Sequence, residues 1–471
     1  MNISKKLSNY FELEKHNTNL RTEILAGLTT FLTMSYIVIV NPTILGRPLF
    51  EGGPSAIQIP GYSTNQVFQM LAIVTILASV IAMLVMAFYA NRPFGLAPGL
   101  GLNAFFAYTV VLQMGFPWQA ALAATVVEGV IFILITVAGA REYVIKAFPK
   151  PVKLSVGTGI GLFLAIIGLQ EMGIVVDDPA TLVTLGNIFQ DPVALLSVIG
   201  LFFTFFLYVR RIRGSIIIGI ISTTIVAYVL NFIGMFPDKA IPSVPSAHYN
   251  IIPLTQGFIE GFGMIGTAEG VTAVAFAVVI FTFFFVDFFD TAGTLIGVSQ
   301  IAGFLDEDGN LPEIDKPLMA DAIGTTFGAM LGTSTVTTYI ESSTGVEEGG
   351  RTGMTALVIA ILFLISMIFV PLAAGVPLFA SHLALVVVAI LMMQNITEVD
   401  WTDLSHVVPA ALTIIIMPLT YNIGYGIAAG IISYPVVKIG KGEWEDLNAP
   451  QVILALLFIA YFYVRTGGVL A

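Results

Sequence analysis

The sequence predicts an all-α polytopic membrane protein, because it is strongly apolar and its apolar runs are long. Of its 471 residues, 57% are hydrophobic and only 10% are charged, and the mean hydropathy is +0.93. An ordinary globular domain has about 25% charged residues, so in water this chain would expose apolar patches far larger than soluble monomers tolerate. We therefore expect lipid to surround most of it.

Fourteen apolar runs are long enough to cross the bilayer, where a helix needs about 20 residues, or fewer when neighbours bury its ends. They lie near residues 22–45, 65–90, 95–113, 117–139, 152–174, 192–209, 214–234, 270–302, 317–332, 334–349, 352–373, 377–396, 404–420 and 422–440. A further run, Val452–Val464, is either a fifteenth span or an interfacial helix.

The Lys and Arg residues predict a cytoplasmic N-terminus, because cytoplasmic loops carry an excess of both. Of the 19, only Arg47 and Lys239 fall in outer loops, and the side of Arg465 depends on the last run. One missed span would invert everything after it, so this distribution also supports the number of spans. The first 20 residues are polar, and we expect no cleavable signal peptide.

The spans divide into two sets of seven around a polar interval at residues 235–268. Because seven is odd, the second set enters the membrane from the opposite side, which is the arrangement of an inverted-topology repeat. The two halves have no convincing similarity residue by residue, so this prediction rests on topology.

Two segments do not resemble simple membrane helices. In Phe94–Phe106, Gly95, Gly99, Gly101 and Pro98 disfavour a continuous helix, since Gly costs about 1 kcal/mol and Pro about 3 relative to Ala. In Gly332–Gly345, the Thr, Val, Tyr and Ile content favours a strand. Non-helical backbone at membrane depth must be buried in protein or line a cavity, and matching breaks in two halves point to a transporter's substrate site. The alternative is a pair of surface loops, but the charge distribution requires both segments to cross.

Acidic residues within the spans are the second indication of function, because intramembrane charges are costly and by default functional. Asp287 and Asp290 lie three residues apart, and Thr294 four further on, so all three share one helix face among phenylalanines. A carboxylate there must be protonated, hydrogen-bonded or next to water. Proton carriage is the functional interpretation; capping or stabilising the bundle is the alternative.

Three further polar residues are candidates. Glu341 lies where the second broken segment turns into a helix, and Asn103 holds the matching place in the first. Each side chain either caps its half-helix or binds a ligand, and the longer acidic side chain of Glu341 favours the ligand role. Glu128 in the fourth span either pairs with a neighbour or helps to relay a proton.

Other classes of function are disfavoured. The chain has no cysteine, and its net charge of −11 without a basic block argues against nucleic acid as a partner. The four histidines are scattered, and no nucleophile–base pair, metal-binding motif or phosphate-binding loop is present in the sequence. We therefore predict no enzyme, no cofactor and no metal.

Four motifs together resemble the AzgA-like purine permeases, a branch of the nucleobase–cation symporter 2 and nucleobase–ascorbate transporter group. The resemblance covers nearly the whole chain. The motifs are Thr22–Ile37 with Val40–Pro42, Gly95–Phe106, Phe285–Leu295 and Gly332–Gly353.

The resemblance implies two inverted repeats of seven segments, arranged as core and gate domains that move in an elevator-like alternating-access cycle. Short strands of the third and tenth segments would meet at the substrate site. The implied division is an N-terminal cytoplasmic segment, two halves of the core separated by the first half of the gate and an extracellular connection, and then the second half of the gate with the C-terminus: residues 1–20, 21–139, 140–234, 235–268, 269–373 and 374–471.

The implied activity is uptake of adenine, guanine or hypoxanthine with a proton across the cytoplasmic membrane, and the resemblance favours a homodimer. The substrate-binding residues it implies are Asp287, Glu341, Asn103, Phe285 and Ser342. For proton coupling it points to the eighth-span acids Asp290 and Asp287, to which we add Glu128 as a relay. A purine is flat, neutral and rich in donors and acceptors, which suits carboxylates at its edge and aromatic rings on its faces.

Two alternatives to a purine permease are weaker. An anion exchanger of the sulfate-permease type shares this fold, but it would need a fixed cation or positive helix ends at the centre, and the buried acids oppose it. A purely structural membrane protein would have little reason to retain Asp287 and Glu341 at depth.

Overall fold

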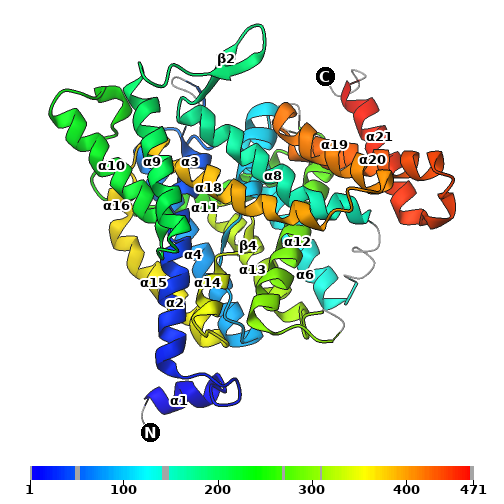
Figure 1. The fold of residues 1–471 in the computed structure, drawn as a ribbon, viewed down its shortest axis with the longest axis horizontal. Helices are drawn as coiled ribbons and strands as arrows, with labels where there is room; N and C mark the ends of the chain where they lie inside the picture. The colour runs from blue at the N-terminus through cyan, green and yellow to red at the C-terminus, as the bar shows by residue number, and fades with distance from the viewer. Residues whose placement is uncertain (1–2, 48–52, 141–147, 268–270, 308–309, 467–471) are drawn as a thin grey trace. The chain divides into compact units, whose positions relative to one another are not determined.

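The computed structural model describes residues 3–47, 53–140, 148–267, 271–307 and 310–466 (Figure 1). They form two compact units. Unit one comprises the described residues within 1–136 and 168–384, and unit two those within 137–167 and 385–471. The core and gate domains predicted from the sequence are defined by movement and not by packing, so they stay a prediction.

Helices make up nearly all of unit one. In chain order they are α1 (Ile3–Tyr10), α2 (Leu20–Met34), α3 (Ile37–Gly46), α4 (Thr64–Val85), α5 (Leu100–Ala104), α6 (Trp118–Val137), α9 (Pro192–Val209), α10 (Ser215–Phe232), α11 (Ile252–Gly263), α12 (Ala273–Ala302), α13 (Asp315–Leu331), α14 (Ser342–Glu347), α15 (Gly353–Ser366), α16 (Val370–Ala373) and α17 (Leu378–Ser381). The helices α8 (Lys150–Glu171) and α18 (Leu383–Met392) contain residues of both units, and the last residue of α6, Val137, belongs to unit two.

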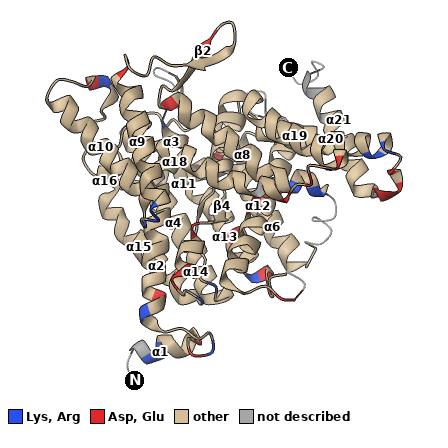
Figure 2. Cartoon of the chain, in the orientation of Figure 1, with Lys and Arg blue, Asp and Glu red and all other residues tan. Residues whose placement is uncertain are grey.

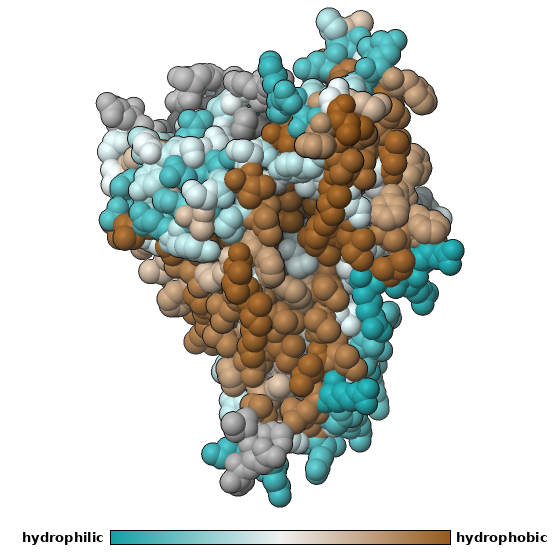
Figure 3. Space-filling model, turned by 90° about the vertical axis from the view of Figure 1, so that its left-hand side faces the viewer, coloured by the Kyte–Doolittle hydropathy of each residue, from teal (hydrophilic) through white to brown (hydrophobic). Residues whose placement is uncertain are grey.

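Ten helices of the described residues are long and apolar enough to cross a membrane. Their surfaces are apolar as well, with Phe202 and Phe206 of α9 and Ile225 and Val229 of α10 more than half exposed. A broad hydrophobic band covers the face drawn in Figure 3, and charged residues gather mainly in loops and at helix ends (Figure 2). Such a surface is stable only against lipid, so the chain is a multi-pass membrane protein.

Both predicted breaks in the third and tenth spans are present. Strand β1 (Leu96–Pro98) precedes α5, which continues as a π-helix over Phe105–Gln113, and strand β4 (Val336–Thr338) precedes α14. The two strands pair antiparallel, with Leu96 opposite Thr338 and Pro98 opposite Val336. All six strand residues are buried, which satisfies the rule that extended backbone at membrane depth lies inside protein.

Small residues allow the helices around these strands to approach closely. A Cβ added to Gly324 of α13 would lie 2.6 Å from the Ala82 Cβ of α4, and one added to Gly328 would lie 3.3 Å from the Ala78 Cβ. This pairing of small residues four apart is typical of membrane helix packing. On another side of α13, a Cβ added to Gly129 of α6 would lie 2.8 Å from the Thr326 backbone nitrogen. The glycine therefore brings α6 close to α13.

Two elements lie in connections where the sequence indicated no helix or strand. Helix α11 occupies part of the polar interval, and its glycines meet α6: a Cβ at Gly257 would lie 2.2 Å from the Trp118 ring, and one at Gly261 would lie 2.0 Å from the Gln119 carbonyl oxygen. Strands β2 (Val175–Asp178) and β3 (Leu182–Leu185) form a hairpin between α8 and α9. Both elements are shorter than a membrane span.

Unit two is built around α19 (Leu404–Thr420) and α20 (Ile423–Gly440), with α21 (Ala449–Thr466) after them. Gly430 of α20 faces the Thr413 hydroxyl of α19, so the two helices approach closely. Asp403 caps α19 by accepting the Ser405 N–H, and Lys441 donates to the same carboxylate at 2.8 Å. The Lys441 ammonium and the Ser405 donors hold the pKa of the Asp403 carboxyl well below its usual range.

A buried carboxylate joins the start of α2 to the start of α15. Glu23 is fully buried, and its oxygens accept the N–H groups of Arg351 and Thr355 at 3.0 and 3.1 Å and the Thr355 hydroxyl at 2.6 Å. The Arg351 N–H lies before α15 and the Thr355 N–H in its first turn, where N–H groups lack the carbonyl four residues back that would continue a helix. Glu23 therefore caps a helix far from it in the sequence.

Substituting Glu23→Ala is expected to lower the thermal stability of the protein in detergent. The change removes the acceptor of the Arg351 N–H, the Thr352 N–H and the Thr355 hydroxyl. A donor left without a partner costs about 1–3 kcal/mol, so the loss should be at least about 2 kcal/mol. Heating followed by size-exclusion chromatography measures it. The control is Glu14→Ala, at an exposed acid before α2. Equal melting temperatures for the two variants would contradict the capping role.

Candidate functional site

The antiparallel pair of strands β1 and β4 forms the frame of the candidate site and lies within unit one; β4 is labelled in Figure 1. The Gly99 N–H donates to the Thr335 carbonyl and the Tyr339 N–H to the Gly95 carbonyl, both at 3.0 Å, on either side of the paired residues. In an antiparallel pair, bonded and non-bonded positions alternate. Val336 is therefore at a non-bonded position, where its own N–H and carbonyl face away from β1.

Asn103, the predicted third-span residue, stabilises the pairing of β1 with β4 through its side-chain hydrogen bonds. It is fully buried, its Nδ2 donates to the Pro98 carbonyl at 3.4 Å, and its Oδ1 accepts the Ser334 hydroxyl. The Tyr339 hydroxyl donates to the same Pro98 carbonyl at 2.5 Å. Both ends of the Asn103 amide thus hold the two broken segments together, a role that differs from the capping and ligand roles expected for it.

Glu341 and Ser342 lie where β4 leads into α14. The Glu341 side chain is 7% exposed, and its Oε1 accepts the Tyr36 hydroxyl at 2.6 Å. It makes no capping bond to α14, so the predicted cap is absent while the carboxylate is held by Tyr36. The Ser342 Oγ accepts the Gly95 N–H at 2.9 Å and so ties the two broken segments together.

Phe285 belongs to a row of aromatic rings along α12. Its ring lies 4.6 Å from that of Phe289 and is stacked on that of Phe281, with 6.1 Å between centroids and 12° between planes. Its side chain is 1% exposed. The ring is thus inside the protein, five residues before Asp290 on the same helix.

Three acids from three helices gather beside β4, and we call Glu128 of α6, Asp287 of α12 and Asp321 of α13 the acid cluster. All three side chains are fully buried, and each is close enough to another member for their charges to interact. No donor group of the described residues reaches either oxygen of Glu128 or one oxygen each of Asp287 and Asp321, and the Glu128 and Asp287 carboxyl groups lie within hydrogen-bonding distance of each other. A buried ionised carboxylate without a donor is strongly unfavourable, so this arrangement fits carboxyl groups that hold protons.

Threonines connect the acid cluster to β4. The Thr325 hydroxyl lies 3.1 Å from Asp287 Oδ2 and 2.9 Å from the Val336 carbonyl oxygen. Thr291 donates to Asp321 Oδ1 at 2.9 Å and meets the Thr337 hydroxyl at 2.9 Å. The strand of the candidate site and the acids thus share hydrogen-bonding partners.

Asp290 differs from Asp287 in its surroundings. It is half-buried, and its charge acts on Glu341 and Tyr339 as well as on Asp287. Its charge also acts on Asp321, so Asp290 lies between the acid cluster and the β4–α14 junction, whereas Asp287 belongs to the cluster.

Asp321, Thr325 and Tyr36 are residues of this site that the sequence analysis did not single out, although Tyr36 lies within the motif Thr22–Ile37. Asp321 had a usable signal, because it is an acid inside the predicted span 317–332 and the rule that selected Asp287 selects it too. Thr325 and Tyr36 had no such signal, since threonine and tyrosine are common in such spans.

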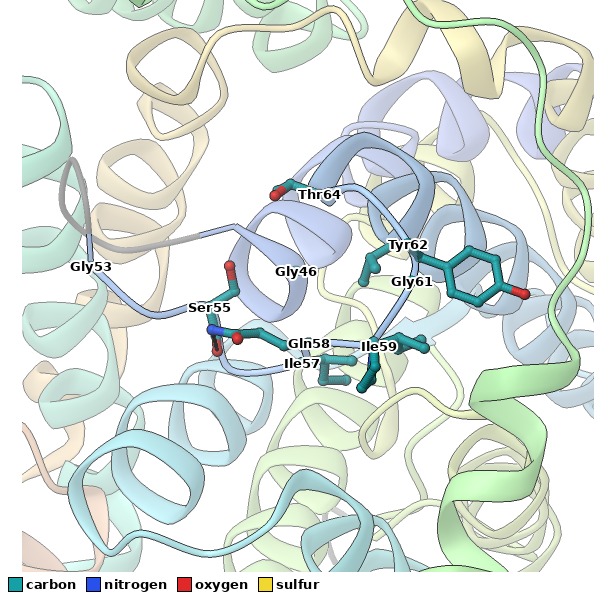
Figure 4. A pocket seen from close by; sticks show the side chains of 11 residues that line it. Gly46, Gly53, Ser55, Ile57, Gln58, Ile59, Gly61, Tyr62 and Thr64 are labelled. Carbon is teal, nitrogen blue, oxygen red and sulfur yellow. Dashed lines mark hydrogen bonds between the residues drawn. The ribbon is translucent and has the colours of Figure 1, made fainter.

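A separate surface cavity of about 650 Å³ lies between the end of α3 and the start of α4 (Figure 4). It is lined by Ser55, Gln58, Tyr62 and neighbouring residues, and by none of the predicted site residues. Across the described parts of the chain, no three histidine or acidic side chains converge closely enough to hold a metal ion.

Comparison with known proteins gives full-length relatives. Adenine permease AdeP of Escherichia coli (strain K12) is 40% identical over 96% of this chain and 95% of its own length. Guanine/hypoxanthine permease PbuG of Bacillus subtilis (strain 168) is 41% identical over 97% of this chain and 99% of its own. The transmembrane domain of the cyanobacterial bicarbonate transporter BicA is similar in fold, with a TM-score of 0.59, 15% identity, and coverage of 88% of this chain and 97% of that one.

The fold similarity and the family match agree. BicA shares the fold of a helical multi-span transporter built as an inverted repeat, although at this identity it says nothing about substrate. The model of the permease family Xan_ur_permease matches residues 21–430, nearly the whole chain. The resemblance drawn from the sequence motifs is confirmed: the chain belongs to this permease family, in its AzgA-like branch, and is a transporter, not an enzyme.

Proposed function

We propose that this permease takes up a purine nucleobase, adenine, guanine or hypoxanthine, together with a proton across the cytoplasmic membrane. The observation that carries the proposal is the antiparallel pairing of β1 with β4 beside two groups of acidic residues. Glu341 lies at the junction that faces Asp290, and the acid cluster lies behind β4. The names of AdeP and PbuG support the substrate class.

The proposed substrate-binding residues are Glu341, Asn103, Phe285, Ser342 and Asp287. A purine edge presents N–H donors and ring-nitrogen acceptors, so Glu341 would accept from it while Tyr36 keeps the carboxylate in place. Asn103 and Ser342 act by holding the backbone of the two broken segments, whose N–H and carbonyl groups complete the edge recognition.

The proposed proton-coupling residues are Asp290, Asp287 and Glu128. The sequence placed Asp287 in both groups, and its burial beside Glu128 and Thr325 supports the proton role over direct contact with the base. A proton carried inward gains about 2.3 kcal/mol per 100 mV and about 1.4 kcal/mol per pH unit. Together these support accumulation ratios of order 10² for one proton.

Movement and orientation belong to the same proposal. Fourteen segments in two inverted sets of seven, with a cytoplasmic N-terminus, would form a core that moves against a gate in an elevator-like cycle. A total of fourteen membrane-spanning segments requires the shorter apolar helices, including residues 100–113 and 404–420, to cross the membrane together with the ten long ones. A homodimer would give the gate a fixed support.

Uptake of labelled hypoxanthine into proteoliposomes containing the purified protein tests the substrate class. Unlabelled adenine, guanine, hypoxanthine, xanthine and uracil are added in turn, with sulfate and bicarbonate as the anions that the shared fold suggests. We expect competition by purines and none by the anions. Uptake that no purine inhibits, or that an anion does, would overturn the proposal.

A further inference from the structure

The Thr325 side chain satisfies both backbone groups of Val336. The Val336 N–H donates to the Thr325 hydroxyl oxygen at 3.0 Å, and that hydroxyl lies 2.9 Å from the Val336 carbonyl oxygen. Val336 is opposite Pro98 at a non-bonded position of the β1–β4 pair, so its N–H and carbonyl have no partners in β1. One hydroxyl of α13 therefore fixes this strand of the substrate site.

The same hydroxyl has a third neighbour, Asp287 Oδ2, at 3.1 Å. A hydroxyl has one proton to donate and two lone pairs to accept with. The Val336 N–H occupies one lone pair, which leaves one proton and one lone pair for two oxygens, those of Val336 and Asp287. Both contacts are hydrogen bonds at once only when Asp287 itself supplies a proton.

The protonation of Asp287 thus decides where Thr325 donates. With a proton, Asp287 donates to Thr325, and Thr325 donates to the Val336 carbonyl. Without one, the Asp287 carboxylate takes the Thr325 proton, because hydrogen bonds to charged acceptors are the stronger ones. The buried Val336 carbonyl then loses its donor, which is unfavourable for this position of β4.

The titratable groups that face Asp287 are Glu128 from α6, Asp321 from α13 and Asp290 from its own helix, all of them acids. The Glu128 and Asp287 carboxyl groups lie within hydrogen-bonding distance of each other, and no donor group of the described residues reaches one Asp287 oxygen or either Glu128 oxygen. A proton arriving at the cluster therefore finds acceptors on both carboxyl groups.

From this geometry we infer that Thr325 is the positioning residue that couples the proton to the substrate. Its hydroxyl donates to the Val336 carbonyl of β4 when Asp287 is protonated, and to the Asp287 carboxylate when it is not. This inference rests on the proposed function. Protonation holds β4 in the conformation that completes the site, so the protonated protein binds the purine more tightly. By reciprocity, bound purine then holds the proton.

Equilibrium binding of labelled hypoxanthine to the purified full-length protein, measured between about pH 8.5 and about pH 5.5, tests the exchange. We expect the wild-type Kd to fall by about 5-fold or more as the pH falls, the lower end of typical coupling between sites. Thr325→Val, which keeps the shape and loses the hydroxyl, should reduce this change to less than about 2-fold. Thr325→Ser, which keeps the hydroxyl, should restore it.

A matched control lies one residue away. Thr326 is also buried on α13, but its hydroxyl donates within the helix to the Ala322 carbonyl at 2.8 Å. Thr326→Val should keep the wild-type pH dependence. If Thr325→Val does not fold, Asp287→Asn answers the question with the hydroxyl in place, because its amide donates to Thr325 at every pH. That variant should bind hypoxanthine with a Kd that does not change with pH.

The outcomes separate the two proposals. A wild-type protein that binds no purine, or whose Kd does not change with pH, contradicts the proposed function. A wild-type Kd that depends on pH, together with equal dependence in Thr325→Val or Asp287→Asn, overturns the inference about Thr325 and leaves the proposed function standing.

Discussion

Glu341→Gln is expected to raise the KM of transport for the preferred purine by about 10²-fold. A hydrogen bond to a charged acceptor contributes about 1.5–3 kcal/mol, and the substitution also places an amide donor where the base presents an N–H. Two facing donors add a desolvation penalty to the lost bond. Because Tyr36 can still donate to the amide oxygen, the change should spare the fold.

Initial rates of labelled adenine and hypoxanthine uptake in proteoliposomes measure this effect, with protein amount and melting temperature recorded for each variant. The control is Glu347→Gln, at an exposed acid on the same short helix α14. A Glu341→Gln protein that transports with a KM close to that of the control would remove Glu341 from the site.

Asp287→Asn is expected to separate exchange from accumulation. The amide cannot gain or lose a proton, so substrate should equilibrate without concentration against its gradient. In the wild type, 100 mV and one pH unit together supply about 3.7 kcal/mol, or an accumulation ratio of order 10². In the variant this ratio should fall to about one, while exchange of internal for external purine continues.

Counterflow and gradient-driven uptake, measured in the same vesicles, distinguish these two activities. The control Asp177→Asn, at an exposed acid of β2, should accumulate substrate as the wild type does. Undiminished accumulation by Asp287→Asn would show that the proton travels elsewhere, with Asp290 and Glu128 the next residues to test.

The spans could be predicted closely because a membrane span is a local property of the sequence. The run expected near 192–209 is α9, Pro192–Val209, and that expected near 404–420 is α19, Leu404–Thr420. Apolar runs end where charged residues, Pro or Gly appear, and these are visible in the sequence. The interruptions were equally visible, because Gly and Pro within a short segment disfavour any helix.

The partners of the site residues could not be predicted, because they come from distant helices. Nothing near Asp287 in the sequence indicates Glu128 or Thr325 as neighbours; Gly129, by allowing α6 against Thr326, brings them together. The register of β1 against β4 likewise depends on the packing of the whole unit. For Asn103, the sequence left capping and ligand binding open, and only its contacts with Ser334 and Pro98 show that it holds the two broken segments together.

Simultaneous recording of purine and proton movement tests the account most directly. Vesicles containing the purified protein and an internal pH indicator receive hypoxanthine without sodium and without an imposed gradient. We expect internal acidification that begins with substrate addition, saturates with it and disappears in Asp287→Asn. In the wild type, a protonophore should abolish this acidification. Purine uptake with no proton movement, or uptake that requires sodium, would contradict proton coupling through the acid cluster.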